Sequence, residues 1–303
     1  MSDDLTRSDG SKTHSEHEGE DGGGEAGDGE EREESQKSYR TILEQEITAG
    51  LHELERPAPG LAMSALSAGL DLGFSVLLMG VMLRLAGGVL PEPVVAILVA
   101  NMYAVGFLFV IFGRSELFTE HTTLAFLPIL DGRASLLQLA RLWGIVYAAN
   151  LAGIAVFSAA LAWFAPRMGI VDTATFHHIA LRMTEQPWWL MLPSAVLAGW
   201  LMGLLSWLVT AGRDTISQVF FAWLVTASIG FAGLHHCILG SGEVLTALFA
   251  GQPVGWGAFG RFLLFSTVGN AVGGTFFVGL IKWGHASGHG GGEGGRPSGP
   301  WRS

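Results

Sequence analysis

The stretch GRSELFTEH at residues 113–121 interrupts an apolar run that extends from residue 94 to residue 130. The stretch GLHHCILGSGE at residues 233–243 interrupts a second apolar run, which extends from residue 217 to residue 250. A helix that breaks at membrane depth frees backbone N–H and C=O groups, which are tolerated only where they are buried in protein or line a wet cavity. The two stretches therefore predict two broken membrane helices around a polar path.

Four further apolar runs have no interruption. Each is long enough to cross a hydrocarbon core of about 30 Å, which needs about 20 helical residues. They occupy residues 60–85, 136–164, 189–211 and 256–283. Together with the two broken segments, they predict an all-α integral membrane protein with six transmembrane helices, of which the second and fifth are broken.

The charge of the chain is concentrated at its beginning. Residues 1–38 hold 13 of the 27 acidic and 4 of the 17 basic residues, so the rest of the chain is nearly neutral. We expect a disordered acidic tail over 1–38, which has almost no large apolar side chains, and a disordered Gly-rich tail over 285–303. For residues 39–58 we expect an amphipathic pre-membrane helix, which lies either on the membrane surface or against its own protein. For residues 59–284 we expect the six-span transmembrane channel domain.

This composition excludes two classes of protein. A nucleic-acid binder needs a basic surface that replaces phosphate counterions. The part of this chain after residue 38 has no excess of basic residues over acidic ones. A disulfide-stabilised secreted domain needs several cysteines, and the chain has only Cys237. We therefore expect the lipid bilayer, and not a nucleic acid, to be the macromolecular environment of this protein.

The two halves of the chain repeat each other. The third and sixth spans match at an offset of 120 residues, and the first and fourth spans match at an offset of 130. Matched pairs are Arg141 and Arg261, Asn150 and Asn270, Gly153 and Gly273, Trp163 and Trp283, and Gly69 and Gly199. Because each half contains three spans, an odd number, the second half must be inserted upside down. The sequence thus predicts two inverted three-helix repeats, the architecture of many transporters and channels.

The two interruptions carry most of the ionisable residues of the predicted membrane region. An ionisable side chain at membrane depth costs at least about 2.5 kcal/mol, so such residues are candidates for function. The half-helices that follow, from about Thr119 and Glu243, direct the positive ends of their dipoles toward the meeting point of the breaks. This arrangement predicts a path for an anion or a polar solute. The candidates are Glu116, Glu120, His121, His235, His236 and Glu243.

The motifs at both interruptions resemble those of the formate/nitrite transporter family. Glu116-Leu117-Phe118-Thr119 is similar to that family's Glu/Asp-Leu-Phe-Thr loop, and Gly233-Leu234-His235-His236 is similar to its Gly-Phe-Glu-His segment. Gly212-Arg213 and Asn270-x-x-Gly273 match as well, and the resemblance covers residues 40–284. It implies a homopentamer of aquaporin-like protomers, each with its own pore for formate, nitrite or similar small monovalent anions.

The resemblance also assigns pore residues. His236 falls on the family's central pore histidine, and Thr119 falls on the loop threonine that faces it. The remaining assignments form two constrictions, with Leu117 and Phe118 on the inner one and Tyr103 and Phe107 on the outer one. The substrate is left open by three departures from the family pattern, which indicate a divergent branch: His235 replaces a glutamate, and Gly240 and Gly199 stand where asparagines are found.

Each candidate also has a structural interpretation. His236 could bind backbone carbonyls as a buried histidine, and Thr119 could cap its helix. His235 could pack against the protein or orient His236. Adjacent histidines without an i, i+4 partner match no strong zinc pattern, so we expect no metal and no other cofactor. Supporting roles are expected for Glu116 as an acceptor for loop N–H groups, for Glu120 and His121 around the break, for Glu243 at a helix dipole, and for Asn150 and Asn270 in interhelical hydrogen bonds.

The function that these features predict is transport across a membrane by a channel or carrier for small monovalent anions or their weak acids, and not enzymatic catalysis. One alternative is a pore for small uncharged solutes such as water, glycerol or ammonia. Another is a non-conducting membrane protein whose acidic tail recruits a partner.

The basic residues near the membrane predict its orientation. Five of them lie on the side of the chain termini and four on the opposite side. This slight excess favours both termini in the cytoplasm of a bacterium or archaeon, with the protein in its inner membrane.

Overall fold

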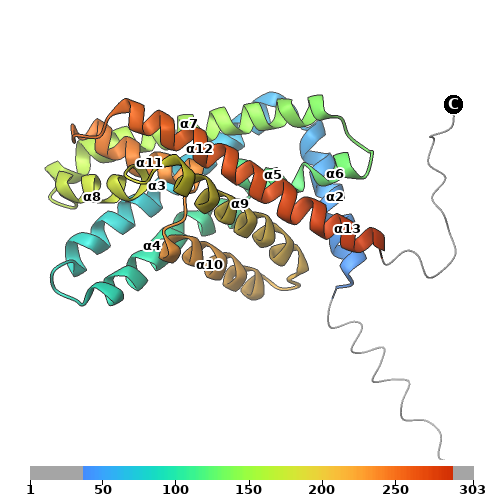
Figure 1. The fold of residues 1–303 in the computed structure, drawn as a ribbon, viewed down its shortest axis with the longest axis horizontal. Coiled ribbons are helices and arrows are strands. Elements are labelled where there is room, and N and C mark those ends of the chain that lie inside the picture. Colours follow the sequence, from blue (N-terminus) through green and yellow to red (C-terminus); the bar gives the residue numbers. More distant parts are fainter. Residues whose placement is uncertain (1–36, 289–303) are drawn as a thin grey trace, which may run out of the picture. The chain divides into compact units, whose positions relative to one another are not determined.

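The structure is a computed structural model that describes residues 37–288, and this part of the chain is helical and contains no strand (Figure 1). The disorder expected for residues 1–36 and 289–303 lies outside the described residues. The helices are α2 (Tyr39–Glu55), α3 (Ala58–Ala86), α4 (Glu92–Gly113), α5 (Phe118–Leu124), α6 (Leu127–Leu130), α7 (Leu136–Arg167), α8 (Thr173–Thr184), α9 (Trp188–Ala211), α10 (Thr215–Ala232), α11 (Cys237–Phe249), α12 (Trp256–Val272), the π-helix η1 (Gly273–Leu280) and α13 (Ile281–Gly288).

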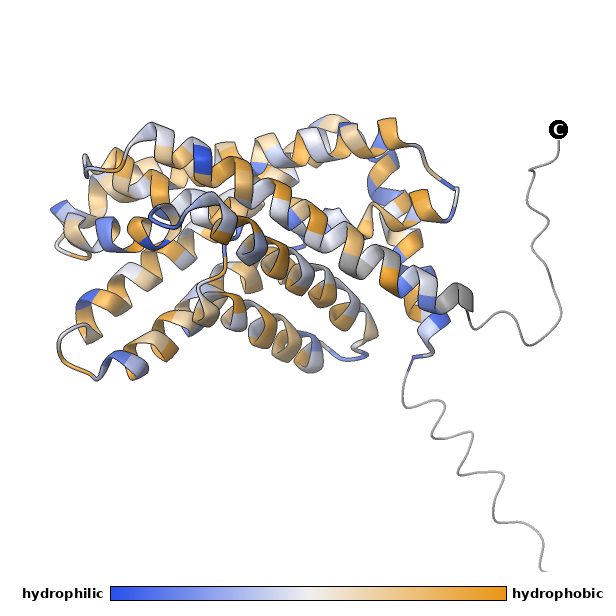
Figure 2. Cartoon of the chain, in the orientation of Figure 1, coloured by the Kyte–Doolittle hydropathy of each residue, from blue (hydrophilic) through white to orange (hydrophobic). Residues whose placement is uncertain are grey.

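Six helical segments of the described chain are long and apolar enough to cross a membrane. They are Ala58–Ala86, Glu92–Gly113, Leu136–Arg167, Trp188–Ala211, Thr215–Ala232 and Trp256–His285. Large apolar side chains such as Val156, Trp163 and Leu264 are more than half exposed on these helices. Figure 2 shows that apolar residues run along the lengths of the helices, whereas hydrophilic residues gather near helix ends and loops. An exposed apolar surface of this kind is suited to lipid.

Both predicted interruptions are breaks between helices, and both breaks begin in the same way. Helix α4 ends with Arg114 in the left-handed region (φ 54°), and α10 ends with Gly233 in the same region (φ 63°). In each case the following residue returns a backbone hydrogen bond to the preceding helix, from Ser115 N to Val110 O and from Leu234 N to Ile229 O. Left-handed residues of this kind are common helix terminators.

The start of the second half-helix was predicted wrongly. It begins at Cys237 and not near Glu243, so the second break spans only residues 233–236. The glycines of the GSG sequence that follows, which suggest a loop, lie inside α11, where close neighbours leave no room for a side chain. A Cβ on Gly240 would lie 2.5 Å from the Phe262 ring, and one on Gly242 would lie 2.7 Å from the Ile154 side chain.

Other departures from the predicted pattern concern short helices. Helix α8 lies between the third and fourth spans, is capped by Asp172, and buries Phe176 and Ile179. The sequence analysis did not predict α8, because its residues do not form an apolar run of membrane length. At the other end, helix α13 continues to Gly288, so the tail predicted for 285–303 does not begin at residue 285.

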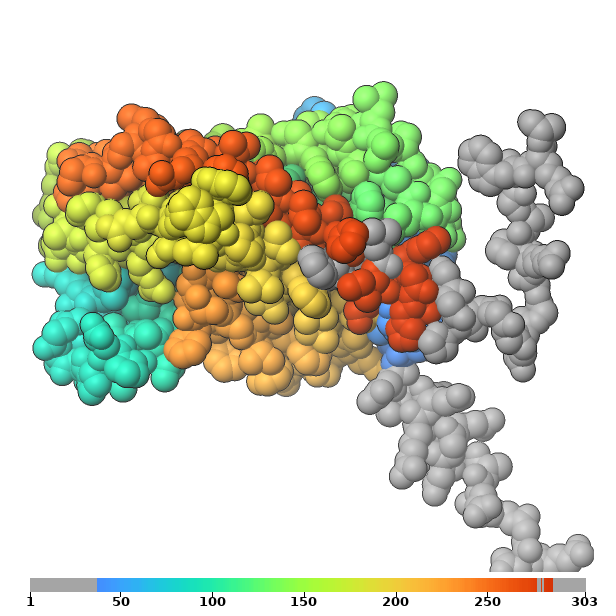
Figure 3. All heavy atoms as spheres, in the orientation of Figure 1, coloured from blue at the N-terminus to red at the C-terminus, as the bar shows by residue number. Residues whose placement is uncertain are grey.

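The first and fourth spans contact the third and sixth spans through glycines at equivalent positions. A Cβ on Gly69 of α3 would lie 2.2 Å from Asn150 O of α7, and one on Gly199 of α9 would lie 2.1 Å from Asn270 O of α12. In the space-filling view, α9 and α12 lie side by side on one face (Figure 3). Gly199, which the resemblance aligns with a pore asparagine, therefore lies in a helix–helix contact. The equivalence of the two contacts is what the internal repeat predicts.

Helix α2 packs on its own protein. Its buried face includes Ile47, Leu54 and the carboxylate of Glu46, which is 1 % exposed. Glu46 accepts hydrogen bonds from Ser206 and Thr210 of α9. Burial raises the pKa of Glu46, and the hydrogen bonds from Thr210 and Ser206 oppose this change.

A Glu46→Gln substitution is expected to stabilise the docking of α2 at alkaline pH. Because folding raises the pKa of Glu46, its contribution to stability is fully present below the pKa of the unfolded chain and is lost as pH rises toward the pKa of the folded state. Glutamine keeps the hydrogen bonds and removes the buried charge, so we expect a gain of about 1 kcal/mol at pH 8 and a flatter pH dependence. Thermal unfolding in detergent at pH 5 and pH 8 measures both effects.

The exposed residue Glu44, which pairs with Arg133 across 3.1 Å, provides the control for this experiment. A Glu44→Gln substitution is expected to change the free energy of unfolding by less than about 1 kcal/mol at either pH, as is usual for surface pairs. A Glu46→Gln protein that is less stable than the unmodified chain at pH 8 would contradict this account of Glu46.

Candidate functional site

The two breaks meet at a buried pair of polar side chains. Thr119, in the first turn of α5, and His236, immediately before α11, are 117 residues apart in sequence, and Thr119 Oγ1 lies 2.8 Å from His236 Nε2. Both residues are at most 1 % exposed. The Phe107 and His236 rings form a T-shaped pair with centroids 5.1 Å apart, and Tyr103 stacks on Phe107 at 5.5 Å. The structure thus brings together four of the residues that the resemblance assigns to the pore.

The hydrogen bonds of His236 select one form of its ring. As the N-cap of α11, its Nδ1 accepts a hydrogen bond from Leu239 N at 3.2 Å. A nitrogen that accepts a hydrogen bond carries no proton, so the ring is neutral and its proton resides on Nε2. His236 Nε2 therefore donates to Thr119 Oγ1, and the Thr119 hydroxyl has no acceptor of its own among the residues that the structure describes. The site offers hydrogen-bonding groups without a net charge.

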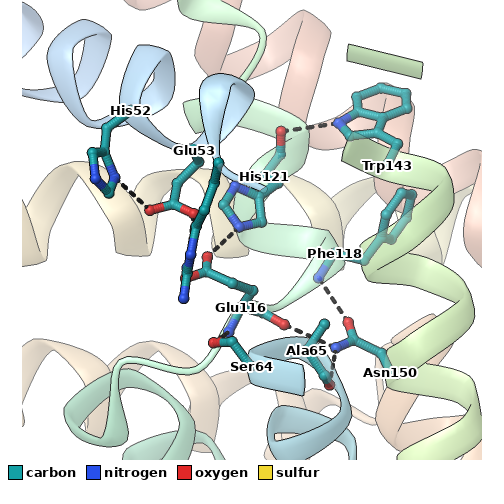
Figure 4. A network of polar contacts seen from close by, with 10 residues as sticks. His52, Glu53, Ser64, Ala65, Glu116, Phe118, His121, Trp143 and Asn150 are labelled. Atoms are coloured by element: carbon teal, nitrogen blue, oxygen red, sulfur yellow. Dashed lines mark hydrogen bonds and ion pairs between the residues drawn. The ribbon is translucent and has the colours of Figure 1, made fainter. Parts of the chain in front are cut away.

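Asn150 of α7 holds the first break (Figure 4). Its Oδ1 accepts from Phe118 N at 2.9 Å, and its Nδ2 donates to Ala65 O at 2.7 Å and to Glu116 O at 2.8 Å. The Glu116 N–H donates to Ser64 Oγ at 3.2 Å. One amide thus ties the start of α5 to α3 and to the loop.

Asn270 of α12 holds the second break in the same way. Its Oδ1 accepts from Cys237 N at 2.8 Å, and its Nδ2 donates to Ala195 O at 2.8 Å and to His235 O at 2.9 Å. The His235 N–H donates to Ser194 Oγ at 3.2 Å. Both asparagines form interhelical hydrogen bonds, and they use N–H groups that the half-helices could otherwise offer to an anion.

Glu116 is the centre of an ionic network on the α2 side of the first break (Figure 4). One carboxylate oxygen contacts the Arg56 guanidinium at 2.5 Å, and the other lies 2.6 Å from His121 Nε2. Arg56 also pairs with Glu53 at 2.9 Å, and Glu53 contacts His52 at 3.0 Å. The Glu116 carboxylate therefore joins the break to the α2–α3 junction, and no loop N–H group is bound to it among the described residues.

A cavity of about 860 Å³ opens beside this network. It is lined by residues of α2, α4, α5, α9 and α10, including Glu53, Arg114, Glu116 and Glu120. Glu120, the neighbour of Thr119 in sequence, thus lines this cavity, and its side chain has no hydrogen bond to the Thr119–His236 pair in the described part of the chain. Arg56 and Glu53 were not among the predicted site residues. Their role depends on the packing of α2 against the first break, and no sequence motif predicts that packing.

A second, small pocket of about 20 Å³ lies on the α8 side of the pair. Its lining includes Tyr103 of α4, Arg182 of α8 and Glu243 of α11. Sequence reasoning missed Arg182 because the prediction contains no helix at α8. Glu243 lies in the second turn of α11, so it is a lining residue of this pocket and does not cap a helix.

The remaining assigned residues are buried in packing contacts. The Phe118 ring packs against Trp143 and Tyr147 of α7 with centroids 5.7 and 4.9 Å apart, and Leu117 is fully buried. Neither residue lines the two cavities. His235 Nδ1 lies 2.8 Å from Ser194 Oγ, so His235 points to α9 and away from Thr119. Residues 37–288 contain no group of three or more His, Cys, Asp or Glu side chains that could hold a metal ion.

Comparisons with known proteins identify the family of the chain and relate its fold to solved structures. A family model described as formate/nitrite transporter matches residues 40–284. The "Inner membrane protein YfdC" of Escherichia coli (strain K12) is 32 % identical over 240 residues, which cover 77 % of this chain and 74 % of the relative. Two solved structures share the fold. An "FNT family ion channel" matches with a TM-score of 0.69 at 24 % identity, covering 82 % of this chain and 98 % of its own. A "Pentameric formate channel with formate bound" matches with a TM-score of 0.62 at 21 % identity, covering 76 % and 98 %.

Proposed function

Because the chain belongs to the formate/nitrite transporter family, we propose that it passes small monovalent weak acids, of the size of formic or nitrous acid, through a pore centred on Thr119 and His236. The chain is a multi-pass membrane protein and not an enzyme. The observation that carries the proposal is the buried hydrogen bond between Thr119 Oγ1 and His236 Nε2 where the two helix breaks meet.

The proposed mechanism follows from the absence of charge at this pair. Moving an ion into an apolar, buried site costs many kcal/mol unless a partner charge compensates, whereas a neutral acid carries a much smaller desolvation cost. The rings of Phe107 and Tyr103 cover one side of the pair and exclude bulk water. A weak acid that has taken up a proton in the cavity beside Glu116 crosses this zone and exchanges hydrogen bonds with His236 Nε2–H and the Thr119 hydroxyl. It releases its proton on the other side.

The surroundings of the pore complete the proposal. One solved structure with this fold is named as pentameric. We propose here the homopentamer that the sequence resemblance implies, with both termini in the cytoplasm and the protein in an inner membrane. The constriction residues assigned by resemblance, Leu117, Phe118, Tyr103 and Phe107, then close the path on either side of His236.

A pore for small uncharged solutes is the second candidate, and the neutral form of His236 favours it. A hydroxyl and an N–H donor serve water or ammonia as well as formic acid. The third possibility, a non-conducting protein whose acidic tail recruits a partner, depends on residues outside the described part of the chain. Deleting residues 1–38 tests it, because lost partner binding together with the absence of flux in the full chain would favour that role.

Transport by the full chain in proteoliposomes tests the proposal directly. Stopped-flow recording with a pH dye inside the vesicles follows formic acid, and light scattering follows glycerol and water. We expect formic acid to acidify the lumen at least about tenfold faster than in empty vesicles, and faster at pH 5.5 than at pH 7.5, because the fraction of neutral acid falls as pH rises. Rapid glycerol or water flux without acid flux would support the second candidate instead.

A further inference from the structure

We propose that the neutral carboxyl group of Glu243 donates a proton to a small oxyacid anion that enters the pocket lined by Tyr103, Arg182 and Glu243, here called the α8 pocket. This inference rests on the proposed function, in which the solute crosses the Thr119–His236 pair as a neutral acid. It names the group that supplies or accepts the proton at one end of that path.

The burial of Glu243 determines its protonation state. Its side chain is 4 % exposed, and within residues 37–288 its carboxyl group forms neither a hydrogen bond nor an ion pair. Burial of an unpaired carboxylate costs far more free energy than burial of the neutral acid, so the group keeps its proton instead of ionising. Glu243 is therefore a neutral proton donor that lines a pocket.

The elements around Glu243 bring one charge close to it. Among the described residues that line the α8 pocket, Arg182 of α8 is the only other charged one, and Tyr103 of α4 adds a phenol. Helices α3 and α10 contribute apolar residues to the lining, and α7 and α12 face α11 with Ile154 and Phe262. The charge of the pocket therefore depends on Arg182 and Glu243.

Arg182 attracts an anion to the α8 pocket. Its side chain is exposed, and a Cβ on Gly233 (φ +63°) would lie 3.1 Å from Arg182 Nη2, so the guanidinium lies over the second helix break. While Glu243 is neutral, the guanidinium gives the pocket a net positive charge, which favours an anion over a cation. Its N–H groups donate charge-assisted hydrogen bonds to the oxygens of a carboxylate or a similar oxyanion.

The Tyr103 hydroxyl offers the anion a second donor. The Tyr103 side chain is 5 % exposed, and its hydroxyl has no hydrogen bond in the described part of the structure, so the site is suited to a polar ligand. A Cβ on Gly230 would lie 2.6 Å from Tyr103 Cγ, so the ring rests directly on the α10 backbone. The cavity of about 20 Å³ has room for one water-sized group. An anion oxygen that enters it therefore lies close to both the phenol and the carboxyl group.

Proton transfer in the α8 pocket leaves the total charge of the pocket and solute unchanged. The O–H bond of Glu243 breaks, its electron pair stays on the carboxylate, and a new O–H bond forms on an oxygen of the anion. The negative charge thus moves from the solute to Glu243, and Arg182 lines the same pocket and stabilises either location. Glu243 then regains a proton from water on the α8 side. In the opposite direction, its carboxylate accepts the proton that the acid releases.

The position of the α8 pocket suits this role. Tyr103 stacks on Phe107, and Phe107 forms a T-shaped pair with His236, so two aromatic rings separate the pocket from the Thr119–His236 pair. A solute that arrives from the α8 side therefore meets Glu243 before it meets these rings. The proton is transferred before the solute enters the part of the path that favours a neutral molecule.

A route through Glu243 weakens the pH dependence of transport. The neutral fraction of a carboxylic acid such as formic acid falls about a hundredfold between pH 5.5 and pH 7.5, so a pore that admits only acid formed in solution loses flux by about that factor. The route through Glu243 starts from the anion, which is the abundant form at both pH values. We therefore expect the flux through the unmodified chain to fall by less than about tenfold over this range.

The experiment measures uptake of isotopically labelled formate by the full chain in proteoliposomes, with equal pH on both sides. Glu243→Gln keeps the size and polarity of the side chain but cannot give a proton. We expect it to lower the flux at least about tenfold at pH 7.5 and much less at pH 5.5, so that its pH dependence approaches that of the neutral acid.

Variants of Arg182 test the same route at an exposed position, where a substitution does not disturb the core. Arg182→Gln is expected to lower the flux about five- to tenfold at pH 7.5 and less at pH 5.5, whereas Arg182→Lys keeps the charge and should restore part of the flux. Glu185→Gln, at an exposed residue that ends α8, is the matched control and should change neither rate.

Three outcomes would overturn the inference. An unmodified chain that takes up no formate overturns the proposed function and the role of Glu243 together. An active chain whose Glu243→Gln or Arg182→Gln variant keeps the unmodified pH dependence overturns the proton-donating pocket alone. A loss of equal size at both pH values in Glu243→Gln also overturns it, because that result indicates a general effect on the pore and not a missing proton donor.

Discussion

A His236→Ala substitution is expected to lower formic acid flux by at least about tenfold and to reduce stability at the same time. The side chain has two tasks in the structure. Its Nδ1 caps α11 by accepting from Leu239 N, and its Nε2 bonds to Thr119 Oγ1 at the meeting point of the breaks. Loss of a helix N-cap costs about 1 kcal/mol, and loss of a buried hydrogen bond at the pore adds to the barrier for permeation.

A His236→Asn substitution separates these two tasks. Asparagine is a preferred N-cap residue, and its shorter side chain does not extend to Thr119. We therefore expect the melting temperature in detergent to return close to that of the unmodified chain while flux stays low. Thermal unfolding and stopped-flow flux on the same preparations measure both quantities. Unchanged rate and pH profile for weak acids in His236→Ala would show that this histidine does not control permeation.

Removing the amide of Asn150 or Asn270 is expected to cause the largest loss of stability in the molecule. Each side chain satisfies one backbone N–H and two backbone C=O groups at a helix break, and each is fully buried. An unsatisfied buried polar group costs about 1–3 kcal/mol, so an alanine at either position should cost at least about 3 kcal/mol. Because the two networks are equivalent, the two losses should be similar.

The control for this experiment is Asn101→Ala. Within residues 37–288, Asn101 bonds only to Ile97 O and to Trp223 Nε1, both at 2.8 Å and at an exposed position. We expect this substitution to cost clearly less than either buried asparagine, by thermal unfolding of the purified protein in detergent. Asn150→Ala and Asn270→Ala proteins that unfold at the same temperature as Asn101→Ala would contradict the assigned role of the two amides.

The spans and the two breaks could be predicted from sequence because the membrane imposes a simple rule. Apolar runs of about 20 residues cross it, and a polar interruption such as 113–121 must be buried in protein. The match of Asn150 with Asn270 also had a local signal, the recurrence of Asn-x-x-Gly at one offset. The structure places these two residues in equivalent hydrogen-bond networks.

Features that depend on tertiary contact had no such signal. Gly240 and Gly242 suggest a loop in sequence, yet they lie in α11 and are glycines because Phe262 and Ile154 leave no room for a side chain. The partners of Glu116 could not be foreseen either, since Arg56 reaches it only after α2 and α3 fold against the first break. Arg182 was missed because α8 is too short to be found as a membrane span.

Passage of the solute across the Thr119–His236 pair as a neutral acid can be distinguished from passage of its anion by the effect of voltage. The decisive experiment records formic acid flux in proteoliposomes at a series of membrane potentials, set by a potassium gradient and valinomycin, with lumenal pH recorded at the same time. We expect a rate that does not depend on potential, with about one proton entering the lumen with each acid. A flux that rises steeply with potential and leaves lumenal pH unchanged would show instead that the bare anion crosses.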